Sequence, residues 1–119
     1  KAVTTALAAA MILSAQDELE VEIIDLATLR PLDREAIIRS VKKTGRLLVV
    51  HDAPLHGGFG GEVLASVVSD EEALRCLKAP PQRLCGKEIP IPFSPELEKQ
   101  ATVTKEEIVK SVRSLFYTT

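Results

Sequence analysis

The chain has 119 residues and a formal net charge of −2, and 45% of its residues are hydrophobic although only 3% are aromatic. This length suits one domain with a modest core, so we expect residues 1–119 to form a single domain. Acidic and basic residues alternate without a basic stripe or aromatic platform, which argues against nucleic-acid binding. No apolar run approaches the roughly 18 residues of a membrane-spanning helix, which argues against a membrane protein.

The beginning of the chain predicts a helix. Residues 2–16 are rich in Ala, Leu, Met and Ile, which favour a helix. Only one lysine precedes this stretch and no clean cleavage site follows it, so a signal peptide is the weaker interpretation. The sequence starts at Lys1 rather than Met. Because an α/β domain usually has a strand before its first helix, we expect the chain to be a fragment whose leading strand lies upstream.

The next segment predicts two strands around a helix. Residues 21–26, "VEIIDL", are short and β-branched and predict a buried strand. Pro31 disfavours a helix just before it, so a loop follows. Asp33 is a good N-cap for a helix that ends at Gly45, a residue typical of the position after a helix. The second strand is expected over residues 46–52, "RLLVVHD".

A further helix and strand follow the glycine-rich stretch. Residues 61–77 have helical periodicity, and the residues expected to face inward are Val63, Leu64, Val67, Val68 and Leu74. Ser69 and Glu72 fit a capping box, so this helix is expected to break there. A third strand is predicted over residues 82–85.

The last part of the chain predicts a surface segment and a closing helix. "KEIPIPFSP" has proline spacing typical of an extended surface run, and Ser94 with Pro95 marks a short helix start. Thr104 and Glu107 form a capping box that opens the final helix. The alternation of helices and strands predicts an α/β fold, a three-layer α/β/α sandwich with a mostly parallel, mixed sheet. The expected inner face of the final helix consists of Ile108, Val109, Val112, Leu115 and Phe116.

The stretch "HDAPLHGGFGGEV", residues 51–63, has the layout of a strand, a glycine-rich turn and a helix. A dinucleotide fingerprint needs a third glycine where Val63 stands, although Gly58 and Gly60 fit its first two positions. The glycine-lysine-serine or -threonine triplet of a phosphate-binding loop is absent from the sequence. The glycines therefore favour a sharp turn that another surface can approach closely.

Both histidines of the chain lie in this stretch. His51 ends a predicted strand at the carboxyl edge of a parallel sheet, where ligands tend to bind. A hydrogen-bonded structural histidine is the alternative. His56 is expected in the loop, and this pair with Asp52 does not make a strong metal pattern. No nucleophile stands beside a base, and Cys85 is expected in the core.

Two further residues are candidates for contacts between proteins. Phe59 stands between glycine pairs and is expected to insert into a neighbouring domain or subunit, or to cap the local core. Arg30, in "LRPLD", could clamp an anion or a partner carboxylate, with a solvated arginine as the alternative. No catalytic, cofactor-binding or metal-ligating residue is predicted. The predicted interface residues are Arg30, His51, His56, Gly57, Gly58, Phe59 and Gly60.

Six motifs follow one another along nearly the whole chain. They are "EIIDLATLRPLD" (22–33), "KTGRL" (43–47), "HDAP" (51–54), "GGFGGE" (57–62), "APPQRLCGKEIPIPFSPELEK" (79–99) and "TKEEIVKSVRSLF" (104–116). In these motifs and their order, the sequence resembles the C-terminal domain of the β subunit of thiamine-diphosphate-dependent 2-oxo acid dehydrogenases, the pyruvate and branched-chain enzymes of the transketolase C-terminal-domain superfamily. Ala27, Asp52 and Glu88 depart from the family pattern, which more often has Arg, Glu and Asp there.

The resemblance implies an assembly domain of an enzyme that decarboxylates a 2-oxo acid and reductively acylates lipoamide. It implies a mixed five-stranded sheet, and thiamine diphosphate and Mg²⁺ held by other domains, with no cofactor in this one. The implied partners are the other domains of the β subunit, the α subunit, a second β subunit in an α2β2 heterotetramer, and the subunit-binding domain of the acyltransferase core.

Two other functions stay open at this point. One is the C-terminal domain of a transketolase or a deoxyxylulose-phosphate-synthase-like enzyme, and the other is a free-standing protein-interaction module. The sequence upstream of Lys1 would distinguish them. Cys76 and Cys85 lack CxxC spacing and predict reduced, partly buried thiols. The expected location is the bacterial cytoplasm, or the mitochondrial matrix in a eukaryote.

Overall fold

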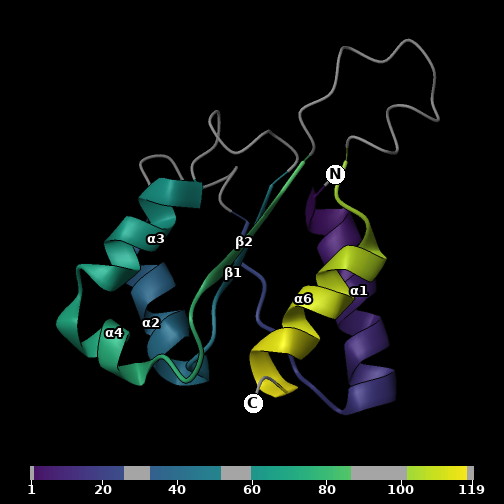
Figure 1. Ribbon diagram of the computed structural model, residues 1–119, viewed down its shortest axis with the longest axis horizontal. Helices are drawn as coiled ribbons and strands as arrows, with labels where there is room; N and C mark the ends of the chain where they lie inside the picture. Colours follow the sequence, from purple (N-terminus) through teal and green to yellow (C-terminus); the bar gives the residue numbers. More distant parts are fainter. Residues whose placement is uncertain (1, 26–32, 52–59, 87–101, 118–119) are drawn as a thin grey trace, which may run out of the picture.

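The computed structural model describes residues 2–25, 33–51, 60–86 and 102–117. Two strands lie in the middle, with α2, α3 and α4 on one side and α1 and α6 on the other (Figure 1). This arrangement confirms an α/β fold with helices on both faces of a sheet. The elements are α1 (Ala2–Asp17), α2 (Arg34–Thr44), β1 (Leu48–His51), α3 (Gly60–Val68), α4 (Glu71–Cys76), β2 (Gln82–Cys85) and α6 (Lys105–Tyr117).

The two strands pair in parallel and divide the core into two clusters. Their register runs from Leu48 opposite Gln82 to His51 opposite Cys85. Successive side chains of a strand point to opposite faces. Val49 accordingly belongs to the cluster under α2, α3 and α4, whereas Leu48 and Val50 pack against the cluster under α1 and α6. The first cluster is built on Ile37, Val41, Val49, Val63, Val67 and Ala73, and the second on Ala9, Leu13, Val103, Ile108, Val109 and Val112.

Local capping explains where α2 begins and ends. The Oδ1 atom of Asp33 accepts a hydrogen bond from the backbone N–H of Ala36 at 3.0 Å, as an N-cap residue does. Gly45 follows the helix with φ +75°, and its N–H donates to the carbonyl of Val41 at 2.7 Å. Both predicted boundaries of this helix are therefore confirmed.

The predicted break in the helix after the glycine stretch is also confirmed, but one residue later than expected. Asp70, not Ser69, caps α4, since its Oδ1 atom accepts from the N–H of Ala73 at 2.9 Å. A new helix starts there, so the positions of α4 that face the core do not continue the periodicity of α3. Ala73 is consequently buried. Val63 and Val67 are buried as expected, but the expectation that Val68 and Leu74 face inward is wrong, because these residues are 45% and 47% exposed.

The final helix begins as the sequence predicts and is fastened at its other end by an arginine. The hydroxyl of Thr104 accepts from the N–H of Glu107 at 3.1 Å, and the Glu107 carboxylate accepts from the Thr104 N–H at 3.1 Å. Near the helix end, Nε of Arg46 donates to the carbonyl of Leu115 at 3.1 Å. The same guanidinium lies 4.0 Å from the ring centroid of Phe116, a cation–π contact.

The strand expected over residues 21–26 is not a strand in the part that the structure describes. Residues 21–25 carry no regular secondary structure, and Leu26 lies outside the described residues. A β-branched run favours an extended chain, but a strand also needs ladder hydrogen bonds to a neighbour. Within the described residues the sheet consists of β1 and β2 alone, so the five strands implied by the resemblance are not seen there.

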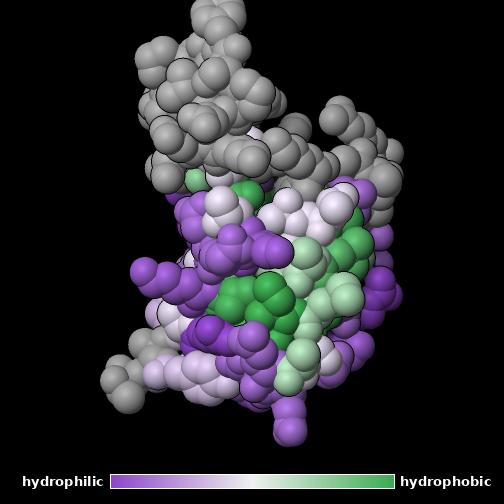
Figure 2. All heavy atoms as spheres, turned by 90° about the vertical axis from the view of Figure 1, so that its right-hand side faces the viewer, coloured by the Kyte–Doolittle hydropathy of each residue, from purple (hydrophilic) through white to green (hydrophobic). Residues whose placement is uncertain are grey.

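One face of α1 is apolar and exposed. Ala9 and Leu13 are fully buried against α6, whereas Leu7 and Met11, one turn apart on the outer side, are 53% and 74% exposed. Figure 2 shows apolar side chains gathered in the middle of this side of the molecule, with polar ones around them. No charged residue occurs between Lys1 and Asp17. We call Leu7 and Met11 the outer stripe of α1.

Replacing Gly45 by Ala should destabilise the fold. A Cβ there would lie 3.0 Å from the carbonyl oxygen of Cys76, at a φ of +75° that L-residues rarely adopt. We expect a loss of about 1–2 kcal/mol in the free energy of unfolding, measured by urea denaturation. Gly61→Ala is the matched control, because its Cβ would meet only Nη1 of Arg83 at 3.4 Å inside a helix. An equal loss in both variants would contradict this account.

Candidate functional site

The candidate site is the end of the molecule where the strands finish. The carboxyl ends of β1 and β2 and the amino ends of α3 and α6 all point to this end (Figure 1). This arrangement follows from the topology, since each helix that comes after a strand starts where that strand stops. In parallel α/β proteins ligands bind at this edge of the sheet.

His51 is the last residue of β1 and lies at this edge, as the sequence predicts. Its backbone carbonyl accepts a hydrogen bond from the N–H of Gly86 at 2.9 Å, which extends the ladder one residue beyond β2. Its side chain is half-buried. Cys85 is its register partner on β2 and is also half-buried. In a parallel pair, register partners project from the same face, so the imidazole and the thiol are neighbours.

That face of the sheet is the one covered by α3. Val49, two residues before His51, belongs to the cluster under α2 and α3. Arg83, two residues before Cys85, projects to the same side, and its Nη1 atom lies next to Gly61 in the first turn of α3. An imidazole, a thiol and a guanidinium therefore gather beside the amino end of a helix.

The sequence predicts a site residue at His51 but not at its two neighbours, Cys85 and Arg83. Cys85 was assigned to the core, and Arg83 was not singled out. The alternation of "QRLC" already places residues 83 and 85 on one face, but the register with β1 decides which face it is. Both cysteines are half-buried, as predicted, and they are not bonded to each other; their reduced state stays a prediction.

Most of the predicted interface residues lie outside the described part of the chain. Gly60 is the first residue of α3, the position at which a helix was expected to follow the glycine turn. The interface roles proposed for His51 and Gly60 remain predictions. The same holds for the residues beyond the described ranges, namely Arg30, His56, Gly57, Gly58 and Phe59.

Ligands for a metal ion do not cluster in the described ranges. Among residues 2–25, 33–51, 60–86 and 102–117, no three His, Cys, Asp or Glu side chains come together as a metal site would require. None of the helices described there combines the length and apolar character needed to cross a membrane.

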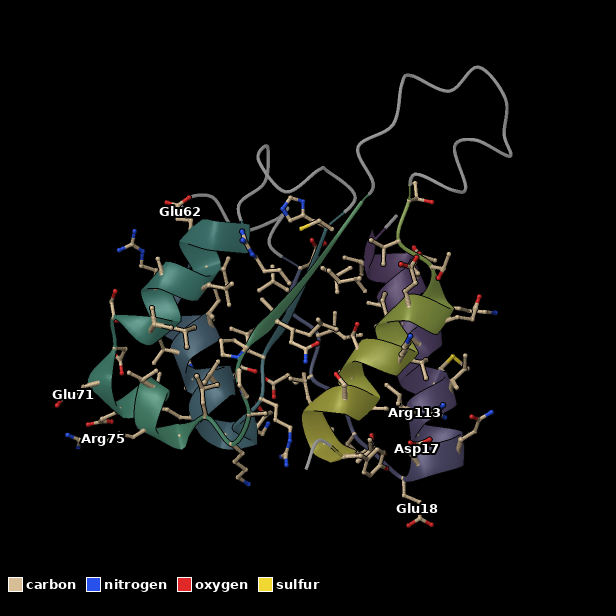
Figure 3. All side chains as sticks on the ribbon, viewed as in Figure 1. Asp17, Glu18, Glu62, Glu71, Arg75 and Arg113 are labelled. Atoms are coloured by element: carbon tan, nitrogen blue, oxygen red, sulfur yellow. The ribbon has the colours of Figure 1, made fainter. Side chains whose placement is uncertain are left out.

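The best-connected charged cluster lies at the other end of the molecule, between α1 and α6. The Arg113 guanidinium donates to both carboxylate oxygens of Asp17, at 3.0 Å from Nε and 2.8 Å from Nη2. Tyr117 donates its hydroxyl to the same carboxylate at 3.2 Å, and Gln16 accepts from Arg113 at 2.8 Å. Figure 3 shows Asp17 and Arg113 facing each other at the lower end of the two helices.

This cluster ties the two helices together and does not resemble a reactive site. The hydrogen bond from Arg113 lowers the pKa of the Asp17 carboxyl below its usual value, although burial acts in the opposite direction. Burial, and then the negative charge of Asp17, raise the pKa of Tyr117. Each group is held in its ordinary charge state at neutral pH, so the cluster supplies structure rather than acid–base chemistry.

Comparison with known proteins gives the chain a family. Residues 1–108 match the family model described as "Transketolase, C-terminal domain". The chain belongs to the transketolase C-terminal domain family. The resemblance seen in the sequence motifs is thereby confirmed.

Three relatives show the kind of subunit in which this domain occurs. The chain is 40% identical over 115 residues to the pyruvate dehydrogenase E1 component subunit beta of Rickettsia bellii, covering 97% of this chain and 34% of that protein. It is 44% identical over 103 residues to the mitochondrial 2-oxoisovalerate dehydrogenase subunit beta 2 of Arabidopsis thaliana, covering 86% and 28%. It is 38% identical over 117 residues to the mitochondrial pyruvate dehydrogenase E1 component subunit beta-2 of rice, covering 98% and 30%. The chain thus spans about a third of the relatives it matches.

The Asp17→Asn variant should reveal the clamp between α1 and α6 through its pH dependence. The folded-state pKa of Asp17 lies below its unfolded value, which is about 3.9, so the carboxylate stabilises the fold above that pH. This stability is lost as the pH falls through the lower, folded-state pKa. We expect the difference in unfolding free energy between wild type and variant to be full at neutral pH and to vanish in strong acid.

Urea denaturation over a pH series measures this difference. Glu71→Gln is the control, because Glu71 pairs with Arg75 on an exposed helix face where both side chains are more than 70% accessible. That variant should match the wild type at every pH. If the difference in unfolding free energy between the wild type and the Asp17→Asn variant persisted in strong acid, the ionised Asp17 carboxylate would not be its cause.

Proposed function

We propose that this domain serves subunit assembly in the β subunit of a thiamine-diphosphate-dependent 2-oxo acid dehydrogenase. The parent enzyme would decarboxylate a 2-oxo acid and reductively acylate lipoamide. Support comes from the relatives, which are β subunits of pyruvate and 2-oxoisovalerate dehydrogenases aligned over most of this chain.

The observation that carries the assembly role is the outer stripe of α1. Leu7 and Met11 expose apolar side chains on a helix without charges from Ala2 to Gln16. An exposed, contiguous apolar surface with a polar surround marks a contact between proteins. Among the described residues, no three His, Cys, Asp or Glu side chains come together as a metal site would require.

The proposed partners are those of a β subunit. They are its own remaining domains, the α subunit and a second β subunit in an α2β2 heterotetramer, and the subunit-binding domain of the acyltransferase core. Thiamine diphosphate and Mg²⁺ would be held by other domains and would supply the chemistry of decarboxylation there. The proposed location is the bacterial cytoplasm or the mitochondrial matrix.

Two alternatives keep the same fold but differ in the parent protein. A transketolase or deoxyxylulose-phosphate-synthase-like enzyme would use a sugar phosphate, and a free-standing interaction module would have no parent enzyme. The motif "KTGRLLVVHDAP" favours the dehydrogenase. Upstream thiamine-binding segments in the full reading frame would support a parent enzyme, and their absence would support the module.

A charge in the outer stripe of α1 should weaken assembly without weakening the fold. Met11→Glu places a carboxylate where 74% of the side chain is exposed in this chain, but where a partner would bury it. We expect about a tenfold loss of affinity for the partner subunits, because burying an unpaired charge is costly. Analytical ultracentrifugation of the full-length subunit with its α partner measures this affinity.

Leu74→Glu is the control for Met11→Glu, since Leu74 is an exposed apolar residue on the opposite layer. It should leave both affinity and melting temperature close to the wild type. Equal loss of affinity in both variants would show that the effect does not depend on the outer stripe of α1.

Phe59→Ala tests the predicted interface residues of the glycine stretch. We expect it to reduce formation of the heterotetramer more than it lowers the melting temperature of this chain, because an interface aromatic contributes to binding rather than to the local core. Size-exclusion chromatography and thermal denaturation provide the two measurements. A large drop in melting temperature with assembly unchanged would make Phe59 a core residue instead.

A further inference from the structure

Beyond the proposed assembly role, we propose that Cys85 is a thiol-modification site for small anionic disulfides, with His51 as the proton acceptor and Arg83 as the contact for the anion. The first support is the sheet register. His51 and Cys85 are partners at the last bridge of the parallel pair, and both side chains are half-buried. The imidazole is therefore a neighbour of the thiol at an edge that solvent reaches.

The second support is the charge around the thiol. Arg83 projects from the same face two residues earlier, and its Nη1 atom lies beside Gly61 at the start of α3. Reactive cysteines occur in partly exposed surroundings of this kind, next to cationic side chains and the amino ends of helices. Glu62, the acidic residue of the first turn of α3, is exposed and projects from the side of α3 away from the strands (Figure 3).

Cys76 has the opposite surroundings, although it is equally half-buried. It is the last residue of α4 and therefore lies at the carboxyl end of a helix, where the partial charge of the helix dipole is negative. The nearby ammonium of Lys42 is paired with Glu72 at 2.8 Å, so its charge is compensated. Cys76 is thus a matched internal comparison for the reactivity of Cys85.

The reaction is thiol–disulfide exchange, in which the disulfide is the oxidant. His51 accepts the proton of the Cys85 thiol, and the thiolate attacks one sulfur of the disulfide. The Sγ–S bond forms as the original S–S bond breaks. The departing thiolate takes the proton from the His51 imidazolium and leaves as a free thiol. One carboxylate of an anionic disulfide would meet the Arg83 guanidinium.

The test compares single-thiol variants, Cys76→Ser to observe Cys85 and Cys85→Ser to observe Cys76. Each is incubated with glutathione disulfide, with neutral hydroxyethyl disulfide or with cationic cystamine. Intact-protein mass spectrometry follows formation of the mixed disulfide. We expect Cys85 to react with glutathione disulfide about tenfold faster than Cys76. A Cys76 rate equal to or above that of Cys85 would overturn the proposal.

Two substitutions test the assigned roles. His51→Gln should slow Cys85 about tenfold with all three reagents while Cys76 keeps its rate, which also shows that the fold is intact. Arg83→Gln should slow Cys85 about threefold with glutathione disulfide and leave hydroxyethyl disulfide unaffected. Arg83→Lys should retain much of the preference for the anion, and Arg75→Gln should change nothing. An unchanged rate in His51→Gln, or equal slowing by Arg83→Gln with every reagent, would overturn the corresponding role.

Discussion

The parallel pairing of β1 with β2 is the constraint on which the rest of the domain depends. Because side chains alternate along each strand, a single register sends Leu48 and Val50 to one core and Val49 to the other. A slip by one residue would exchange these faces and leave both helical layers without their contacts. The same register places His51 beside Cys85. The pairing of β1 with β2 therefore determines both which residues enter each core and which side chains meet at the edge of the sheet.

The sequence predicts well those features that a few neighbouring residues determine. Asp33 and Gly45 bound α2 through contacts within four residues, and the Thr104–Glu107 box starts α6 in the same way. The strand at Gln82–Cys85 was also predicted with its observed bounds. Propensity and capping act locally in all these cases, so no knowledge of the rest of the fold was needed.

The features that failed depend on contacts distant in the chain. Residues 21–25 have the composition of a strand, but a strand exists only with a partner for its backbone. Leu74 faces outward because the helix restarts at Asp70 with a new phase, which periodicity over a longer window cannot show. The neighbours of His51 were missed for a related reason, since pairing across strands is not encoded in either strand alone.

The helix α1 has one face that is buried in the fold and another that is exposed. Ala9 and Leu13 of α1 are buried against α6, while Leu7 and Met11 remain exposed. The sequence predicts a helix here but does not distinguish its faces. The structure buries one of its faces in the fold and leaves another exposed, and the exposed face is the one proposed to meet a partner.

The bidentate pair between Asp17 and Arg113 also has a consequence for the order of synthesis. It joins α1, at the start of the chain, to α6, at its end, and the core beneath these helices draws residues from both ends. The buried residues of the other core all come from one continuous segment of the chain, residues 37–73. Because the ribosome releases the chain from its amino end, the core around Ile37 and Val67 can form before α6, the packing partner of α1, has been synthesised. The apolar residues of α1 that pack against α6 are thus exposed until α6 has been synthesised, so this helix depends on protection from aggregation during that interval.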